Sequence, residues 1–187
     1  MPSDNPALIL QTLDSRLDHE VELTLIGKSA LWLGFDDPPL SYGTTQDVDA
    51  VVPAHQSDQV NDDLAFWDAL SETNEELRAA GIYLTHIFED WQIIMRKDWF
   101  ARRLPVIRPV LKHIKLFRPA TLDLILSKMM RGADPQHMEE IGWMIAREHI
   151  AREELLAAIS SAHVPDEEEV AEAFAVARTS VLAMMRW

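Results

Sequence analysis

The chain has 187 residues and a formal net charge of −14; 48% of its residues are hydrophobic, 26% are charged and none is cysteine. This composition excludes disordered and fibrous classes, a disulfide framework and thiolate chemistry, and the acidic balance disfavours broad binding to nucleic-acid backbones. Because no basic stretch precedes an apolar one and no apolar run approaches ~18 residues, we expect a cytoplasmic protein with no signal peptide and no membrane contact.

Hydrophobic periodicity predicts that helices and strands alternate in the first part of the chain. We expect a helix at 7–17, a strand at 21–26, a short helix at 30–33, a loop at 36–45 and a strand at 48–52. A long amphipathic helix over 57–80 is predicted to end at Gly81.

Three further strands are expected at 82–88, at 91–95 and, as a short edge strand, at 113–117. The remaining chain is predicted to be helical, with helices at 121–131, after the Asp134-Pro135 cap, at 151–161 and at 165–187. The order of elements predicts an α+β protein: a mixed sheet flanked by helices in residues 1–118, and a helical C-terminal region, 119–187, packed on that core.

Charge is distributed unevenly along the sequence. Residues 1–95 contain 3 Lys or Arg and 18 Asp or Glu, whereas residues 96–131 contain 10 and 2. The basic stretch could meet a phosphate-bearing ligand, or it could neutralise the acidic N-terminal half.

A small-residue turn follows the first predicted strand. Gly27-Lys28-Ser29 lacks the upstream glycine of a P-loop, because Glu22 occupies that position. A turn of this kind at a helix start presents backbone N–H groups and a hydroxyl to an anion, although a purely structural turn explains the same residues.

Two acidic residues open the second predicted strand. Asp47 and Asp49 are two residues apart, so their side chains project to the same side, roughly 6.6 Å apart along the strand. Carboxylates this close repel unless a cation or a proton lies between them, and such oxygen ligands suit Mg²⁺. A strand that begins in a solvated loop is the alternative.

Taken in order, the strand ending in Gly27-Lys28-Ser29, the short helix and the strand opening Thr45-Gln46-Asp47-Val48-Asp49 resemble the nucleotidyltransferase superfamily with the polymerase-β-like fold. The segments at 83–88, Trp99 and 118–131 look like a bacterial family of nucleotidyltransferase-like proteins, some relatives of which are toxin or antitoxin components. The similarity covers most of residues 20–148.

The resemblance implies a Mg²⁺-dependent protein that binds an NTP and transfers a nucleotidyl group to an acceptor, which could be a protein, an RNA or a small molecule. It implies that Asp47 and Asp49 are the metal ligands and catalytic residues. The residues implied to bind the nucleotide are Gly27, Lys28, Ser29, Lys128 and Arg131. The last two lie three residues apart and are expected to share one helix face.

The third carboxylate that completes the metal site in that superfamily is not evident here. The candidates for a third metal ligand are His86, Glu89 and Asp90. A degenerate interaction protein, such as a toxin–antitoxin component, is therefore the alternative. The C-terminal helices, with apolar Val181, Leu182, Met184, Met185 and Trp187, are the expected surface for a homodimer or a partner protein.

Overall fold

The computed structural model describes residues 4–185, which divide into two compact units. The first contains the described residues up to Glu89 together with Arg103–Arg118, and the second contains Asp90–Arg102 and the residues from Pro119 onward. Residues 90–102, predicted to belong to the 1–118 core, therefore group with the helical C-terminal part.

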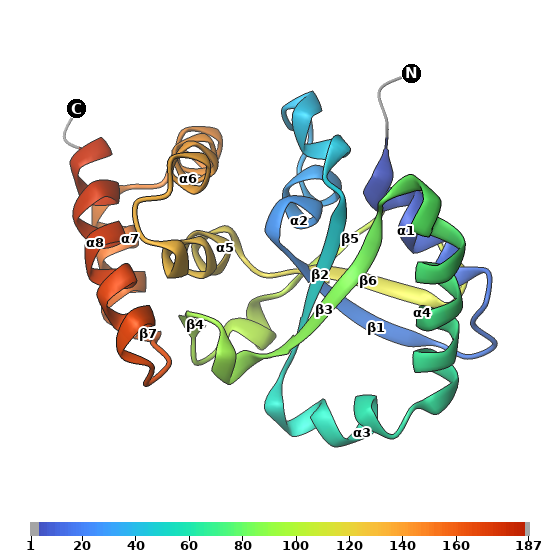
Figure 1. The fold of residues 1–187 in the computed structure, drawn as a ribbon. Coiled ribbons are helices and arrows are strands. Elements are labelled where there is room, and N and C mark those ends of the chain that lie inside the picture. The colour runs from blue at the N-terminus through green and yellow to red at the C-terminus, as the bar shows by residue number, and fades with distance from the viewer. Residues whose placement is uncertain (1–3, 186–187) are drawn as a thin grey trace. The chain divides into compact units, whose positions relative to one another are not determined.

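The first unit is built on a five-stranded sheet with the strand order β3-β2-β1-β6-β5 (Figure 1). The strands are β1 (Val21–Ile26), β2 (Asp47–Val52), β3 (Tyr83–Glu89), β5 (Leu104–Val106) and β6 (Ile114–Arg118). β1 is antiparallel to β2 and parallel to β6, while β2 is parallel to β3 and β5 is antiparallel to β6. This arrangement confirms the predicted α+β class with a mixed sheet flanked by helices.

The helices of the first unit are α1 (Asn5–Asp14), α2 (Gly27–Gly34), α3 (Ser57–Asn61) and α4 (Leu64–Leu77), with 3₁₀ turns at Leu40–Thr44, Ala54–Gln56 and Arg78–Ala80. α1 contacts β2 and α4, α4 contacts β3, and α2 contacts both β1 and β2. The prediction of one helix over 57–80 is wrong. The chain breaks at Asp63, whose carboxylate accepts the backbone N–H of Phe66 (3.0 Å) and so caps the start of α4.

The two faces of the sheet differ in character because side chains alternate along each strand. One alternating set is fully or almost fully buried: Leu23, Leu25, Val48, Ala50 and Leu84. The other set carries the polar residues: Glu22 pairs with Lys115, Asp49 lies opposite Ile26 on β1, and His86 lies opposite Asp49 on β3. Asp49 and His86 therefore lie on the same face of the sheet as Glu22 and Lys115, a face that also carries the buried residues Ile26 and Val51.

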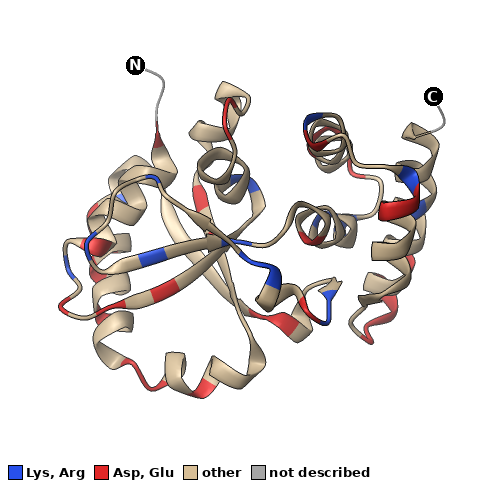
Figure 2. Cartoon of the chain, turned by 180° about the vertical axis from the view of Figure 1, so that it is seen from behind, with Lys and Arg blue, Asp and Glu red and all other residues tan. Residues whose placement is uncertain are grey.

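Ion pairs connect the basic stretch to the acidic N-terminal half. Lys115 contacts Glu20 (Nζ–Oε1, 2.6 Å), and Arg103 contacts Glu22 (Nη1–Oε2, 3.2 Å). Figure 2 shows Lys and Arg segments (blue) and Asp and Glu segments (red) on neighbouring strands of the sheet. For these residues the structure supports the reading in which the basic stretch neutralises the acidic half.

A buried carboxylate connects the end of α1 to the start of β6. Asp14, 9% exposed, accepts the backbone N–H groups of Lys112 (2.9 Å), His113 (2.7 Å) and Ile114 (2.9 Å). Burial raises the pKa of Asp14, but the three N–H bonds together outweigh burial and lower the pKa below its ordinary value. The charged carboxylate is thus the form that the fold stabilises.

Replacing Asp14 by alanine is expected to lower the free energy of unfolding by about 2 kcal/mol at pH 7, because N–H groups at the start of β6 lose their acceptor. Since the folded pKa is depressed, the contribution is present above the ordinary aspartate pKa of ~3.9 and is lost as the pH falls through the folded pKa. Urea unfolding at pH 7 and pH 3 checks this: the wild-type advantage must shrink at pH 3. An equal gap at both pH values would contradict the account.

The second unit is mainly helical. Its helices are α5 (Thr121–Lys128), α6 (Pro135–Glu148), α7 (Arg152–Ser160) and α8 (Glu168–Met184); the short strands are β4 (Met95–Arg96) and β7 (Ala162–His163), and 3₁₀ turns lie at Asp90–Gln92, Trp99–Arg102 and Met129–Arg131. The predicted cap of α6 is confirmed, because the Asp134 carboxylate accepts the N–H of His137 (3.0 Å). Residues 186 and 187, at the end of the predicted last helix, lie outside the described residues.

The expected strand at 91–95 is largely wrong. Residues 90–92 form a 3₁₀ turn, in which Ile93 donates its N–H to the carbonyl of Asp90 (3.2 Å). Only Met95 and Arg96 form a strand, and they pair with Ala162 and His163. Among the helices of residues 4–185, none combines the length and the apolar character needed to cross a bilayer.

Candidate functional site

The turn after β1 and the acidic start of β2 meet in the first unit. Ile26, the last residue of β1, pairs with Asp49, and α2 begins at the next residue, Gly27. Gly27 has a φ of +67°, a conformation that favours glycine. A Cβ atom placed on Gly27 would lie 3.8 Å from Oδ2 of Asp49. The backbone of the turn therefore lies directly beside the Asp49 carboxylate.

A register shift in β3 brings two polar side chains to the same carboxylate. Val48 pairs with Leu84 but Asp49 pairs with His86, so Thr85 is an extra residue on β3. The Thr85 hydroxyl donates to Oδ1 of Asp49 (2.7 Å), and Nδ1 of His86 lies 3.5 Å from the same oxygen. Irregularities of this kind re-aim side chains, and here Thr85 and His86 both reach Asp49.

The other predicted residues of the turn and strand have different environments. Asp47 is exposed, and its Oδ1 accepts the hydroxyl of Thr45 (2.8 Å). Ser29 is 1% exposed and donates its hydroxyl to the carbonyl of Ile26 (2.9 Å). The Ser29 hydroxyl is thus buried and bonded within the turn, and nucleotide binding by Ser29 stays a prediction. Lys28 is partly exposed in the first turn of α2.

The candidates for a third metal ligand are separated by the fold. His86 lies beside Asp49, whereas Glu89 pairs with Val52, the last residue of β2. Asp90 belongs to the second unit, where it accepts the indole N–H of Trp99 (3.0 Å). Across residues 4–185 no group of three or more histidine, aspartate or glutamate side chains is arranged to hold a metal ion. An ion at Asp49 would take part of its coordination from outside the chain.

The two basic residues predicted to bind phosphate lie in the second unit and do not share a surface. Lys128, at the end of α5, is 4% exposed, and its ammonium is bonded to the carboxylate of Glu140, which is 1% exposed. Arg131 is exposed in the 3₁₀ turn that follows. The prediction of a common helix face is corrected, because the α-helix ends at Lys128 and the buried Glu140 already neutralises its charge.

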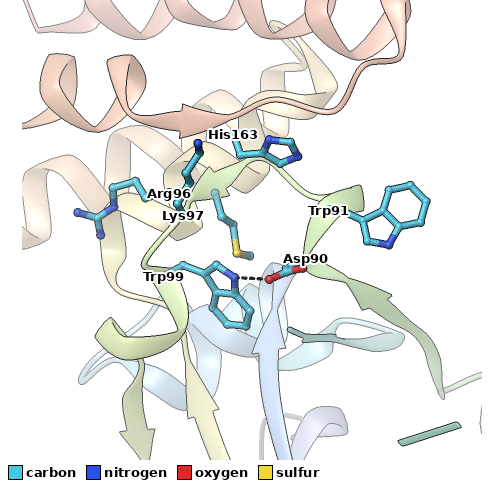
Figure 3. A pocket seen from close by; sticks show the side chains of 7 residues that line it. Asp90, Trp91, Arg96, Lys97, Trp99 and His163 are labelled. Atoms are coloured by element: carbon cyan, nitrogen blue, oxygen red, sulfur yellow. Dashed lines mark hydrogen bonds between the residues drawn. The ribbon is translucent and has the colours of Figure 1, made fainter. Parts of the chain in front are cut away.

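A pocket in the second unit was not predicted. It has a volume of about 270 Å³ and is lined by Asp90, Trp91, Met95, Arg96, Lys97, Trp99 and His163. In Figure 3 the indole of Trp99 and the carboxylate of Asp90 point toward one another, as their hydrogen bond requires. The pairing of β4 with β7 brings His163 beside Met95 across 68 positions of sequence, and no local sequence pattern signals this contact.

Comparisons with family models, curated proteins and solved structures give no match for this chain. The functional argument therefore rests on the residues of the site and on the motifs they form. Within the first unit, the structure brings together Gly27, Asp49, Thr85 and His86, which we call the Gly27–Asp49 site.

Proposed function

We propose that this chain is a nucleotidyltransferase-like protein that binds an NTP with Mg²⁺ at the Gly27–Asp49 site and transfers a nucleotidyl group to an acceptor. The observation that carries the proposal is the proximity of the Gly27 turn to the Asp49 carboxylate. These are the two features that the resemblance assigns to the phosphates and to the metal. Because NTPs are present in the cytoplasm, we propose that the protein acts there.

The residues fit a single divalent ion. Mg²⁺ is commonly held by one or two carboxylates, with nucleotide phosphates and water completing its shell. Asp49 offers Oδ2 on the side of Gly27, and Asp47 lies two residues away on the same strand. When bound, the ion would neutralise phosphate charge and stabilise the charge that develops in phosphoryl transfer.

The chain's own groups have separate roles in this proposal. Gly27 has no side chain, so phosphate oxygens can approach the backbone at the start of α2, where N–H groups favour an anion. Thr85 holds Oδ1 of Asp49 through its hydroxyl and so leaves Oδ2 directed toward the turn. The turn positions the nucleotide, and the carboxylates position the ion.

A second candidate function is nucleotide binding without transfer, as in a degenerate toxin–antitoxin component. The observation that favours it is His86, which stands beside Asp49 where the resemblance implies a carboxylate. On this reading a homodimer or a partner protein would use the C-terminal helices, where Val176 is 53% and Met184 39% exposed on α8.

Isothermal titration of each of the four NTPs, with Mg²⁺ and with EDTA, tests the binding step. We expect binding only with Mg²⁺, and affinity at least about tenfold weaker in Asp49→Ala, because one lost charge-assisted contact is worth ~1.4 kcal/mol or more. Asp47→Ala is expected to weaken binding in the same direction. Asp68→Ala, which removes an exposed carboxylate on α4, is the matched control and should bind like wild type.

Release of pyrophosphate from the bound NTP, assayed with cell extract as the source of acceptor, separates the two functions. Turnover that requires Asp49 supports transfer, and Mg²⁺-dependent binding without turnover supports the second candidate. Binding that is indifferent to Mg²⁺, or equal in Asp49→Ala and Asp68→Ala, would contradict both.

A further inference from the structure

We propose that the pocket of the second unit binds a small organic anion, in which a carboxylate or a phosphate monoester is carried on a flat apolar body. The pocket has a volume of about 270 Å³, and every residue that lines it belongs to the second unit. The residues of the Gly27–Asp49 site all belong to the first unit. The inference therefore does not depend on the proposed nucleotidyl transfer.

The apolar part of the pocket is held in place by bonds that exist without a ligand. The buried side chains of Met95 and Trp99 line it. Trp99 is fixed because its indole N–H bonds to the Asp90 carboxylate (3.0 Å), and Met95 is fixed because β4 pairs with β7. Trp91, which is 49% exposed, adds a second indole at the edge of the pocket (Figure 3). Such surfaces accept a flat apolar group.

The charged side chains of the pocket differ in whether the protein already occupies them. Arg96 is bonded to Asp123 through its guanidinium, and Asp90 accepts the indole N–H of Trp99. Within residues 4–185, by contrast, the side chains of Lys97 and His163 form no hydrogen bond or ion pair. The groups that remain for a ligand are thus an ammonium and an imidazole, which suit an anion.

The local fold places these two groups together. His163 pairs with Met95 across the two short strands, and Lys97 follows Met95 by two positions. Residues two apart on an extended chain point to the same side, so Lys97 and His163 share a side of β4. In Figure 3 both lie at one end of the pocket, and Asp90 with Trp99 lies at the other. The anionic group of the ligand is therefore placed beside Lys97 and His163, away from the Asp90 carboxylate.

The size of the pocket limits the ligand. Its volume lies just below the range of ~300–1,000 Å³ that is typical of sites for drug-sized molecules. A single substituted ring fits this space, whereas an NTP, with its base, ribose and three phosphates, is too large for it. The pocket is therefore assigned to a ligand other than the nucleotide.

Nuclear magnetic resonance of the chain labelled with ¹⁵N-tryptophan tests the inference, because the indole N–H of Trp99 reports directly on the pocket. The probes share a phenyl ring and differ in charge: benzoate and phenyl phosphate are anions, benzyl alcohol is neutral and benzylamine is a cation. We expect an anion to shift the Trp99 signal saturably with a Kd of about 10 mM or tighter. Benzyl alcohol and benzylamine should bind at least about tenfold more weakly.

The double variant Lys97→Gln/His163→Gln removes both free groups and should weaken binding of the anion about tenfold, measured at about pH 6, where an imidazole carries positive charge. Lys112→Gln/His149→Asn is the matched control, because it removes an exposed lysine and an exposed histidine that do not line the pocket. The control should bind the anion like wild type.

The other outcomes would overturn the inference. Benzylamine or benzyl alcohol that binds as tightly as the anions would show that the pocket does not select negative charge. Equal affinity for the anion in wild type and in Lys97→Gln/His163→Gln would remove the role of those two side chains, and the absence of a saturable shift with every probe would remove the pocket as a site. None of these results affects the proposed function, which the Asp49-dependent titration of NTPs tests separately.

Discussion

Replacing Lys128 by alanine is expected to lower the free energy of unfolding by about 3–5 kcal/mol, because it removes the ammonium that pairs with the buried Glu140 carboxylate. Glu140 is 1% exposed and, besides Lys128, accepts the side-chain N–H of Gln136 (3.3 Å). That contact is weaker than a bond to an ammonium, so it offsets little of the loss. Urea unfolding followed by far-ultraviolet circular dichroism at pH 7 measures the change.

The double variant Lys128→Met/Glu140→Leu separates the loss of the pair from the loss of one charge. Replacement of a whole buried pair by apolar residues of similar volume is often neutral or stabilising, so the double variant should recover most of the stability. It also distinguishes the structural role of Lys128 from the phosphate-binding role that the resemblance implies. A folded double variant with wild-type NTP affinity supports the structural role, and one that no longer binds NTP would restore the predicted role.

Replacing Asp123 by alanine is expected to cost a similar amount, about 3–5 kcal/mol, because it leaves the Arg96 guanidinium without its buried partner. Asp123, in the first turn of α5, is fully buried and accepts three N–H groups of Arg96: the backbone N–H (3.0 Å), Nε (3.0 Å) and Nη2 (2.6 Å). In the wild-type chain this carboxylate raises the pKa of the Arg96 guanidinium. Arginine stays protonated at neutral pH even without a partner, so proton loss does not relieve the unpaired charge in the variant.

The exposed pair formed by Asp98 and Arg102 is the matched control. Both side chains are 53% exposed, so Asp98→Ala should leave the free energy of unfolding nearly unchanged. Arg96 also belongs to β4 and lines the pocket of Figure 3. Asp123→Ala should therefore also speed amide hydrogen exchange at Met95 and Arg96. Equal losses of stability in the two variants would contradict the account, because they would show that the buried Asp123–Arg96 pair stabilises the fold no more than an exposed pair does.

The main strands of the sheet could be predicted from sequence because their signal is local. Alternating apolar residues marked β1, β2 and β3, and glycine with proline marked the turns between them. The break before α4 also had a local signal, since Asp63 precedes the helix by one position and has the side chain of a good cap. Hydrophobic periodicity alone predicts one continuous helix across α3 and α4 and does not reveal the break at Asp63.

Other features depend on partners far away in the chain. β5 and β7 have three and two residues, and they exist only through pairing with β6 and β4. From the sequence, Lys128 is a basic residue on a predicted helix, and no residue near it indicates that it is buried and paired with Glu140. Such contacts are set by tertiary packing, which local propensity does not encode.

The candidate site shows the same division. The Gly-x-Ser turn and the Asp-x-Asp strand could be recognised by their motifs, and the antiparallel pairing of Ile26 with Asp49 brings them together. The one-residue shift on β3 could not be predicted, because it depends on the register with β2. That shift places Thr85 and His86 at Asp49 and leaves Glu89 opposite Val52, the last residue of β2.

A crystal structure of the chain with Mn²⁺ and a non-hydrolysable NTP tests the central claim most directly, because the anomalous signal of manganese locates the ion independently of the nucleotide. The account predicts an anomalous peak within bonding distance of the Asp49 carboxylate, with the triphosphate lying along the Gly27 turn. A nucleotide bound elsewhere, for instance in the pocket lined by Trp91 and Lys97, or a metal peak away from Asp49, would contradict it.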